Sequence, residues 1–329
     1  MPRTPMTITR RFSILAPLAL GACAVMEPRL EPAQDKLNAF GRSADATLDT
    51  WKSALFTRQA KDAQGRWAAL EKKAGGRLGV AVLGGGRVFA AHRGDERFAL
   101  CSTFKLALAA LTLREAQAGR LDLREIVTYS EADLLEHAPE TRANLATGMS
   151  IQDLAKAAQV TSDNTAANLL LARFGGPDGF TQRLRAIGDD VTRLDRIEPE
   201  MNRVKAGEVQ DTTTPIAYAL TALRIATGDV LIPAHRDLLV GWMRETQTGA
   251  ARLRGVLPAD WNAGDKTGTG YGNGILNKTN DVAVAFPLKL GPVAIAAYYE
   301  APLAAAEARP EDEAVLAEAG KIAVRALGA

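Results

Sequence analysis

The spacing of hydrophobic residues along the chain predicts short strands combined with buried or amphipathic helices. Residues 78–83 and 87–92 are two short runs rich in valine, alanine and leucine, with three glycines at 84–86 between them. Two such runs joined by a glycine turn are typical of a β-hairpin. Later runs of the same kind predict three more strands, at 265–269, 281–286 and 293–299.

Helical patterns lie on both sides of these strands and, for a long stretch, between them. A helix is predicted over 60–73, and another over 311–327 after Pro310. From Ser102 to about Met243 the pattern is mostly helical. Because short hairpins favour antiparallel pairing, this order predicts an α/β fold of the α+β type. We expect a five-stranded antiparallel sheet flanked by N- and C-terminal helices, with an all-α domain inserted between strands 2 and 3.

The expected domains follow from the same order of elements. The α/β domain is discontinuous, and a catalytic groove is expected between it and the all-α domain. The N-terminal extension shows no recognisable chemistry, although residues 37–56 have a loose amphipathic helical pattern. The predicted parts are a signal peptide (1–24), the extension (25–60), the α/β domain (61–95 and 250–329) and the all-α domain (96–249).

Composition and total charge are those of an ordinary globular protein. The 329 residues are 47% hydrophobic and 24% charged, with a formal net charge of +2. This length is sufficient for an ample core. The balanced total gives no sign of a nucleic-acid partner or of a polybasic membrane patch.

The first residues have the pattern of an export signal. Arginines at positions 3, 10 and 11 precede an uncharged run over 12–26, which is too short for a comfortable membrane span at about 20 residues. Ala22-Cys23-Ala24 resembles a peptidase site, and the arginine pair resembles a twin-arginine signal. Residues 20–23 also resemble a lipoprotein box, so a lipid anchor at Cys23 is the alternative to cleavage. We expect a periplasmic or secreted protein.

Two cysteines occur in the sequence, Cys23 and Cys101. Because Cys23 is either removed or lipidated, no intrachain disulfide is expected in the mature chain. Cys101 is interpreted as a small buried hydrophobic residue rather than a reactive thiol. The sequence has no cluster of Cys and His with ligand spacing, so we expect no metal and no organic cofactor.

One short motif stands at the start of the most apolar predicted helix. Ser102 and Lys105 form an S-x-x-K pattern, and the run from Phe104 to Leu111 is apolar on almost every side. Residues three apart share a helix face, so the hydroxyl and the amine should project together. A serine beside a lysine in an apolar site is one way to build an activated nucleophile. A capping serine before a surface lysine gives the same pattern.

Three further segments favour the catalytic interpretation. They are Ser162-Asp163-Asn164, Lys266-Thr267-Gly268, and Glu198 followed four residues later by Asn202. Each alone is compatible with a routine turn, strand end or loop. None of the three histidines lies in such a motif, so a Ser-His-Asp triad is poorly supported. Together, S-x-x-K, S-D-N and K-T-G form the motif set of class A β-lactamases and penicillin-binding proteins.

In these motifs the chain resembles the class A serine β-lactamases, from about Leu78 to its C-terminus. Glu198 and Asn202 separate that family from the penicillin-binding proteins, which lack the pair. The resemblance implies hydrolysis of the β-lactam amide of penicillin- and cephalosporin-type antibiotics through a serine acyl-enzyme, and hence antibiotic resistance. It also implies a small-molecule β-lactam substrate, and we expect a monomer without a nucleic-acid partner or a membrane span.

Carried over position by position, the resemblance implies catalytic roles. Ser102 is the nucleophile, Lys105 is its proton partner, and Ser162 relays a proton to the leaving nitrogen. Glu198, with Asn202, activates the water that clears the ester. Whether Lys105 or Glu198 takes the proton during acylation stays open.

The resemblance also implies which residues bind the substrate. Asn164 contacts Lys105 and the side-chain amide of the substrate. The oxyanion hole uses the backbone N–H groups of Ser102 and Thr269. The substrate carboxylate is bound by the segment Lys266, Thr267, Gly268 and Thr269.

The loop that carries Glu198 is expected to have two features of the family. Arg196 and Asp211 match the ion pair that closes its omega-shaped loop. The Glu198-Pro199 peptide bond is expected to be cis, since bonds before proline tolerate that isomer.

Two positions depart from the usual pattern of the family. Many members place an arginine on the strand after K-T-G, but Thr279 occupies that position here. Arg252 matches the alternative arginine of other members, and a guanidinium suits a carboxylate. His137 replaces an aromatic residue at the mouth of the groove, so an altered substrate preference is expected.

Two other functions use the same motifs. A covalent β-lactam sensor would be acylated and would hold the drug, although the pair Glu198 and Asn202 argues against it. A DD-peptidase or esterase on the same scaffold would turn over D-Ala-D-Ala peptides or esters instead.

Overall fold

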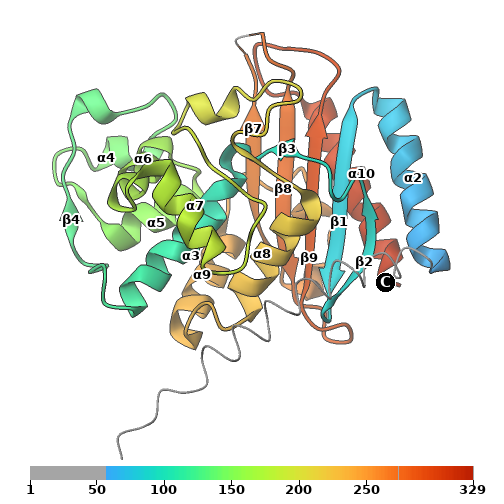
Figure 1. Cartoon of the computed structure of the whole chain (residues 1–329), viewed down its shortest axis with the longest axis horizontal. Helices are drawn as coiled ribbons and strands as arrows, with labels where there is room; N and C mark the ends of the chain where they lie inside the picture. Colours follow the sequence, from blue (N-terminus) through green and yellow to red (C-terminus); the bar gives the residue numbers. More distant parts are fainter. Residues whose placement is uncertain (1–56, 273, 329) are drawn as a thin grey trace, which may run out of the picture. The chain divides into compact units, whose positions relative to one another are not determined.

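A computed structural model describes residues 57–272 and 274–328 of the chain. Its centre is a five-stranded antiparallel sheet with the strand order β2-β1-β9-β8-β7 (Figure 1). The strands are β1 (Arg77–Gly84), β2 (Arg87–His92), β7 (Gly264–Gly270), β8 (Lys278–Ala285) and β9 (Val293–Glu300). The predicted sheet is therefore confirmed, and each predicted strand agrees with the observed one to within a few residues.

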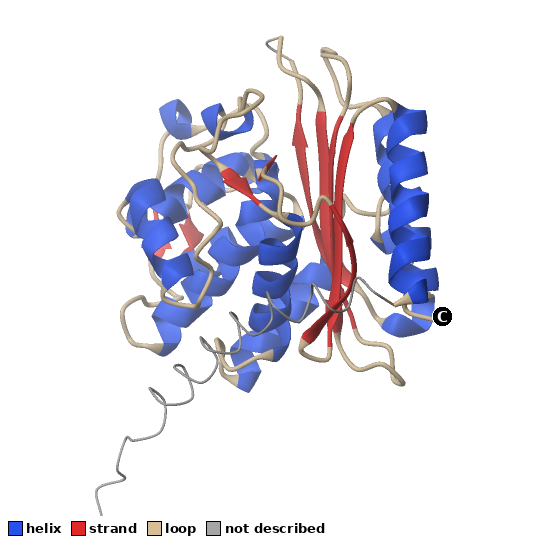
Figure 2. Ribbon diagram, turned by 45° about the vertical axis from the view of Figure 1, so that its right-hand side comes forward, coloured by secondary structure: helices blue, strands red, loops and turns tan. Residues whose placement is uncertain are grey.

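Two helices cover one face of the sheet, as Figure 2 shows. They are α2 (Arg58–Ala74) and α10 (Pro310–Ala326). Helix α2 buries Ala60, Ala63 and Trp67, and the Trp67 indole N–H donates to the Ala319 carbonyl at 3.1 Å. Helix α2 ends at Gly75, whose φ of 79° is the left-handed conformation that glycine adopts without strain.

The opposite face of the sheet is covered by helices from the long insertion between β2 and β7. Helix α8 (Pro215–Thr227) packs on β1 and β9. Helix α3 (Phe104–Gln117) is the most buried helix of this part and packs against α5, α6, α8 and α9. The remaining helices are α4 (Pro139–Ala143), α5 (Ile151–Val160), α6 (Asn164–Arg173), α7 (Gly176–Arg185) and α9 (Pro233–Glu245).

The alternation of side chains along the strands divides the core into two clusters. On β1, Val80 and Val82 face α2 and α10, whereas Ala81 and Leu83 face α3 and α8. Successive residues of a strand point to opposite faces, so a strand between two helical layers is apolar on both sides. This explains why β1 is a nearly continuous apolar run in the sequence.

Short elements fix the loops that surround the insertion. Strand β3 (Phe98–Ala99) pairs with β6 (Thr212–Thr213), and β4 (Ile126–Val127) pairs with β5 (Met149–Ser150). The β3–β6 pair ties the chain just before the S-x-x-K motif to the far end of the loop that carries Glu198. The 3-10 turns are η1 (Cys101–Thr103), η2 (Glu131–Asp133), η3 (Glu200–Asn202), η4 (Arg254–Val256) and η5 (Ala259–Trp261).

The predicted signal peptide and the helical pattern at 37–56 lie outside the described residues. Within 57–272 and 274–328, none of the helices has both the length and the apolar character required to cross a bilayer.

Candidate active site

Ser102 lies in η1, directly before helix α3, and two residues from elsewhere in the chain hold the segment that precedes it. The backbone N–H of Leu100 donates to the Asp211 carbonyl at 2.9 Å. The Asn280 amide donates to the carbonyls of Ala99 and Leu100 at 2.8 and 3.2 Å. Cys101 has a φ of 44°, a conformation that is uncommon for a non-glycine residue. These contacts hold the serine hydroxyl at a fixed place at the start of a buried helix.

Lys105 lies one turn further along and is fully buried. Its Nζ is 3.0 Å from Ser102 Oγ, 2.8 Å from the Ser162 carbonyl oxygen and 2.5 Å from Asn164 Oδ1. Burial lowers the pKa of Lys105, and the nearby Glu198 carboxylate opposes that shift. The sequence prediction that hydroxyl and amine project together is confirmed.

The carboxylate of Glu198 completes this group from the long loop between α7 and β6. Its Oε1 accepts from Ser102 Oγ at 3.1 Å and lies 3.0 Å from Lys105 Nζ. Its Oε2 accepts from Asn202 Nδ2 at 2.6 Å. Glu198 is 1% exposed and Lys105 is fully buried, whereas Ser102 is partly exposed. The amine and the carboxylate are therefore shielded from bulk water behind a serine that remains accessible.

The loop that carries Glu198 is closed by a buried acidic residue. Asp211 accepts from the backbone N–H groups of Asp195 and Arg196 at 2.7 and 2.9 Å, and from Arg196 Nε at 2.5 Å. The predicted pairing of Arg196 with Asp211 is present, and the Glu198-Pro199 bond is cis as expected. The loop is thereby anchored directly beside the residues that hold Ser102.

The S-D-N and K-T-G segments meet on the other side of Ser102. Lys266 Nζ donates to Ser162 Oγ at 3.1 Å, and Lys105 Nζ lies 3.4 Å from the same oxygen. Burial and, secondly, the charge of Lys105 lower the pKa of Lys266 to about 7. Ser162 has a φ of 61°, so its hydroxyl is held by an unusual backbone conformation between two lysines.

Strand β7 is an edge strand of the sheet, and its K-T-G end approaches η1 closely. A Cβ atom at Gly268 would lie 2.9 Å from the Leu100 carbonyl oxygen and 3.0 Å from the Thr103 nitrogen. Glycine at this position therefore allows β7 to lie against the serine segment. Beside it, the hydroxyls of Thr267 and Thr248 are 2.6 Å apart, and Thr269 is partly exposed.

Arg252 reaches this end of β7 from the segment after α9. Its Nη1 donates to the carbonyls of Gly268 and Asn280 at 3.1 and 2.9 Å, and its Nη2 donates to Thr269 Oγ1 at 2.9 Å. Thr279 on β8 is the register partner of Thr269 and is buried. The guanidinium thus lies beside Thr269, and its role in binding the substrate carboxylate stays a prediction.

His137 lies beside the S-D-N segment, and its side chain is exposed. Its Nε2 is 2.9 Å from the Thr161 carbonyl oxygen, and its own carbonyl accepts from the Asn164 backbone N–H at 2.9 Å. These contacts attach His137 to both sides of the S-D-N segment. Its imidazole is therefore oriented although it is open to solvent.

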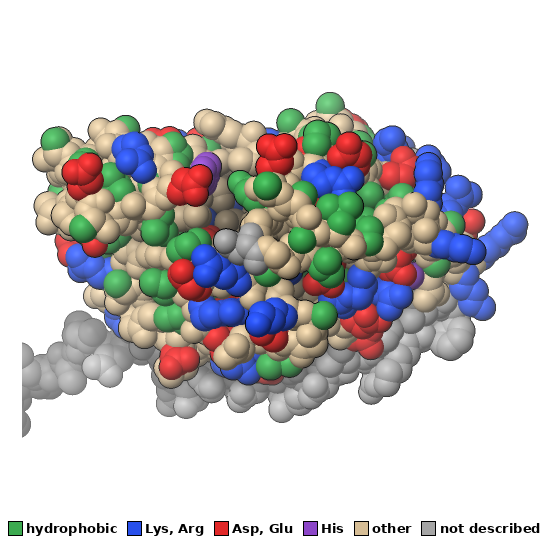
Figure 3. All heavy atoms as spheres, turned by 90° about the horizontal axis from the view of Figure 1, so that it is seen from above, with side chains coloured by type: hydrophobic (Ala, Val, Ile, Leu, Met, Phe, Trp, Pro, Cys, Tyr) green, Lys and Arg blue, Asp and Glu red, His purple; other side chains and the backbone are tan. Residues whose placement is uncertain are grey.

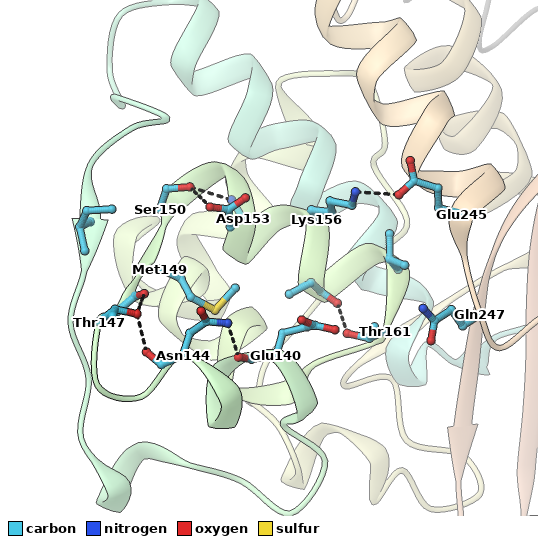
Figure 4. A pocket seen from close by; sticks show the side chains of 14 residues that line it. Glu140, Asn144, Thr147, Met149, Ser150, Asp153, Lys156, Thr161, Glu245 and Gln247 are labelled. Atoms are coloured by element: carbon cyan, nitrogen blue, oxygen red, sulfur yellow. Dashed lines mark hydrogen bonds and ion pairs between the residues drawn. The ribbon is translucent and has the colours of Figure 1, made fainter.

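A separate cavity of about 590 Å³ lies in the helical part and shares only Thr161 with the segments described above (Figure 4). Helices α4 and α5 and the end of α9 line it, and an ion pair of 2.7 Å between Lys156 and Glu245 spans one side. None of the motif residues lines this cavity, so it is distinct from the Ser102 site.

Two residues of the site were not singled out from the sequence. Asn168 donates to the Glu198 carbonyl at 2.9 Å and accepts from its backbone N–H at 3.0 Å, so it fixes the peptide that carries the carboxylate. Its spacing of four from Asn164 on one helix was a usable signal. Glu313, at the start of α10, accepts from Arg252 Nε at 3.0 Å. No local pattern marks that contact.

Among residues 57–272 and 274–328, no group of three or more His, Cys, Asp or Glu side chains is arranged to hold a metal ion. Cys101 is buried, and burial raises the pKa of its thiol to about 12. A thiol of this kind is protonated at neutral pH and is a poor nucleophile.

Comparison with known proteins identifies close relatives over most of the chain. Residues 63–327 match the model of the β-lactamase enzyme family. The β-lactamase L2 of Stenotrophomonas maltophilia is 46% identical over 268 residues, which cover 80% of this chain and 85% of that protein. The β-lactamase AST-1 of Nocardia asteroides is 44% identical over 266 residues, covering 80% and 83%.

Solved structures give the same result. An ancestral class A β-lactamase of Gram-negative bacteria superposes with a TM-score of 0.75 at 47% identity, covering 80% of this chain and 99% of that one. A structure described as the putative class A β-lactamase PenP from Rhodopseudomonas palustris has a TM-score of 0.75 at 42% identity, with coverages of 80% and 99%.

Proposed function

The chain belongs to the class A β-lactamases, and from this membership we propose how its own residues hydrolyse the β-lactam amide. It is a β-lactam hydrolase, and this activity confers resistance to β-lactam antibiotics. The mechanism proposed here is acylation of Ser102 followed by hydrolysis of the ester with Glu198 as the base. The observation that carries it is the meeting of Ser102 Oγ with Lys105 Nζ and Glu198 Oε1 at 3.0 and 3.1 Å.

In acylation, Ser102 Oγ attacks the lactam carbonyl and loses its proton. Lys105 and Glu198 both lie within hydrogen-bond reach of that oxygen, so a neutral Lys105 amine or an ionised Glu198 carboxylate accepts the proton directly. The C–N bond then breaks, and the nitrogen takes a proton from Ser162. Ser162 is suited to this step because it contacts Lys105 and Lys266 and is reprotonated from them. The oxyanion is stabilised by the N–H groups of Ser102 and Thr269, which is worth about 3–4 kcal/mol for one such donor.

The carboxylate of the substrate is bound at the K-T-G end of β7. Lys266 supplies positive charge, and the hydroxyls of Thr267 and Thr269 supply donors. Arg252 supports this site through Thr269 Oγ1, which its Nη2 contacts at 2.9 Å. Gly268 brings the strand close enough to η1 for a single ring to reach both Ser102 and the carboxylate site.

In deacylation, a water held by Glu198 and Asn202 attacks the ester carbonyl. The Oδ1 atom of Asn202 is buried and has no hydrogen-bond partner among the described residues, so an acceptor is available for that water. Because Glu198 Oε1 already touches Ser102 Oγ, the water binds beside this contact rather than within it. Glu198 takes the proton of the water as the new C–O bond forms. The bond between the acyl carbon and Ser102 Oγ then breaks, and Glu198 returns the proton to Ser102 Oγ, which it contacts at 3.1 Å.

The acylamino side chain of the substrate is assigned to the other wall of the site. The Asn164 side chain contacts Lys105 and offers its Nδ2 to the side-chain amide of the substrate. His137 lines the mouth of the groove, with its ring oriented by the Thr161 carbonyl. Arg196 and Asp211 act at a distance by closing the loop that places Glu198.

Mass spectrometry of the intact protein with benzylpenicillin tests the proposed mechanism. We expect Glu198→Ala to accumulate one acyl adduct on Ser102, while the unmodified chain turns the substrate over and remains unlabelled. Accumulation of the adduct on the unmodified chain, without turnover of nitrocefin, would instead identify a sensor. Turnover of D-Ala-D-Ala peptides without that of penicillin would identify a DD-peptidase.

We also propose the setting in which the enzyme acts. Residues 1–24 direct export to the periplasm or the medium, with either cleavage after Ala24 or lipidation of Cys23. As a second part of this setting, the exported chain acts as a monomer. Its α/β domain comprises residues 61–95 and 250–329, and its all-α domain comprises residues 96–249. Analysis of the N-terminus of the exported protein by mass spectrometry distinguishes cleavage from lipidation.

A further inference from the structure

The total charge of +2 conceals an uneven distribution of basic side chains. Helix α2 has five exposed basic residues and two acidic ones. Asp62 is exposed and pairs with Arg66 at 2.7 Å, whereas Glu71 is turned inward, where it binds Arg93 and the Leu78 backbone N–H. The basic residues are Arg58, Lys61, Arg66, Lys72 and Lys73.

The spacing of these residues places them on one side of the helix. Arg58, Lys61 and Lys72 recur at intervals that share a helix face, and Arg66 and Lys73 flank that face. The opposite side carries the buried residues Ala60, Ala63 and Trp67, which hold α2 on the sheet and on α10. The basic face of α2, defined by the five residues above, therefore points away from the protein.

The basic face of α2 has short side chains at its centre and long basic side chains around them. Its centre carries Gly65 and Ala69, which are exposed and short, so the long basic side chains rise around them. Arg58, Lys72 and Lys73 make no ion pair with the described residues. Figure 3 shows lysine and arginine side chains gathered along the edge of the molecule at which α2 lies in Figure 1.

We propose that the basic face of α2 docks on a membrane surface that contains anionic phospholipid. A row of exposed lysine and arginine side chains is attracted to such a surface by roughly 1 kcal/mol per residue. The position of α2 in the chain supports this occupant. Segment 24–57 connects α2 to Cys23, the alternative lipid site, and spans about 110 Å if fully extended. Charge attraction at α2 would then bring the enzyme against the membrane to which its N-terminus is directed. The proposal needs export but not the catalytic mechanism.

Sedimentation with lipid vesicles tests the proposal on the exported chain carrying Cys23→Ser, so that no acyl group contributes to binding. We expect the protein to sediment with vesicles of phosphatidylcholine containing about 30% phosphatidylglycerol, and not with pure phosphatidylcholine. Binding should weaken strongly between about 50 and 300 mM salt, because exposed charges are screened over shorter distances at higher ionic strength.

A triple variant and a matched control locate the surface. Arg58→Gln with Lys72→Gln and Lys73→Gln should lower the partition coefficient by about a hundredfold. Arg124→Gln with Lys205→Gln and Lys289→Gln removes the same charge from exposed positions elsewhere and should change it much less. Hydrolysis of nitrocefin by both variants shows that they are folded. Equal binding to neutral vesicles, equal loss in the two triple variants, or binding to heparin without binding to vesicles would overturn the proposal.

Discussion

The Nζ atom of Lys105 lies 3.0 Å from Oε1 of Glu198, and neither side chain has any exposed surface. The two residues come from α3 and from the loop before β6, so this contact joins the segment of the proposed nucleophile to the proposed deacylation base. Ser102 Oγ lies within 3.1 Å of both atoms. A proton leaving the serine therefore goes to Glu198 when Lys105 is charged, or to Lys105 when its amine is neutral.

This pairing predicts that Lys105→Met is costly for both stability and activity. Removing one partner of a buried ion pair leaves the other charge uncompensated, which costs about 3–5 kcal/mol. Loss of general-base assistance should lower kcat/KM for benzylpenicillin by about 10²–10⁴-fold. Urea unfolding and steady-state kinetics measure the two effects. As a control, Lys156→Met breaks the exposed pair with Glu245 and should cost less than about 1 kcal/mol. Similar losses in both variants would contradict the assigned role of Lys105.

The lowered pKa of Lys266 leads us to predict how kcat/KM depends on pH. This pKa is lowered to about 7 by burial and by Lys105. In the proposed mechanism, the charged form of Lys266 holds the substrate carboxylate. We therefore expect kcat/KM to fall as the pH rises through about 7. Lys266→Arg should remove this alkaline limb, because a guanidinium stays charged at all these pH values. An identical limb in both proteins would assign it to another group.

The same lysine affects stability with the opposite sign. The folded-state pKa of Lys266 lies below the value of 10.5 expected for a free lysine. Between about pH 7 and pH 10 the unfolded chain therefore binds more protons than the folded one at this residue. The Lys266 contribution to the free energy of unfolding should rise with pH over this window. Comparison of urea unfolding of the unmodified chain and Lys266→Met at pH 7 and pH 9 measures this contribution.

The variant Asp211→Asn is predicted to impair deacylation more than acylation. The Asp211 carboxylate accepts from two backbone N–H groups and from Arg196, and it holds the loop that positions Glu198. Asp211→Asn tolerates the left-handed φ of 55° but loses the charge. We expect an unfolding free energy lower by about 3 kcal/mol and a kcat that falls more than the acylation rate in a stopped-flow burst.

Glu208 provides the control for this prediction. It lies 3.7 Å from the other side of Arg196 and is partly exposed. Glu208→Gln should cost less than about 1 kcal/mol and leave the burst unchanged. If Asp211→Asn slows both steps equally, the ion pair supports the whole site rather than the loop alone.

Arg252 is predicted to act on substrate binding. Arg252→Ala removes the guanidinium beside Thr269, and KM for penicillins should rise by about tenfold or more, since a hydrogen bond to a charged group is worth about 1.5–3 kcal/mol. Glu313→Gln changes the partner of Arg252 Nε. The hydrogen bonds from Arg252 Nη1 to the carbonyls of Gly268 and Asn280 stay in place. This substitution should change KM much less. An unchanged KM in Arg252→Ala would remove the assignment.

The order of strands and helices could be predicted from the sequence because hydrophobic period and glycine turns are local signals. The family resemblance carried by the motifs likewise predicted that Ser102, Lys105 and Lys266 share one site. Contacts across long separations were not predictable in the same way. The direct bond between Ser102 and Glu198 joins residues 96 positions apart and depends on how the loop packs. The contact of Glu313 with Arg252 depends on how α10 crosses β8.

The basic face of α2 shows a different limit of sequence reasoning. The total charge gave no sign of a basic surface, because acidic residues elsewhere in the chain compensate it. The helical period does separate the basic side chains from Trp67, but only the fold shows that Glu71 is turned inward and paired with Arg93. A summed charge therefore predicts less than the charge on each exposed helix face.

His137 provides the last prediction, which concerns substrate preference. His137→Tyr replaces the imidazole with a ring that cannot make the same 2.9 Å contact with the Thr161 carbonyl. Ring contacts are worth about 0.5–1.5 kcal/mol, so the ratio of penicillin to cephalosporin kcat/KM should change by about threefold to tenfold. His137→Gln retains a donor for Thr161 without a ring. If the ring selects the substrate, Gln and Tyr should shift the ratio differently. An unchanged ratio in His137→Tyr would show that this position does not set the preference.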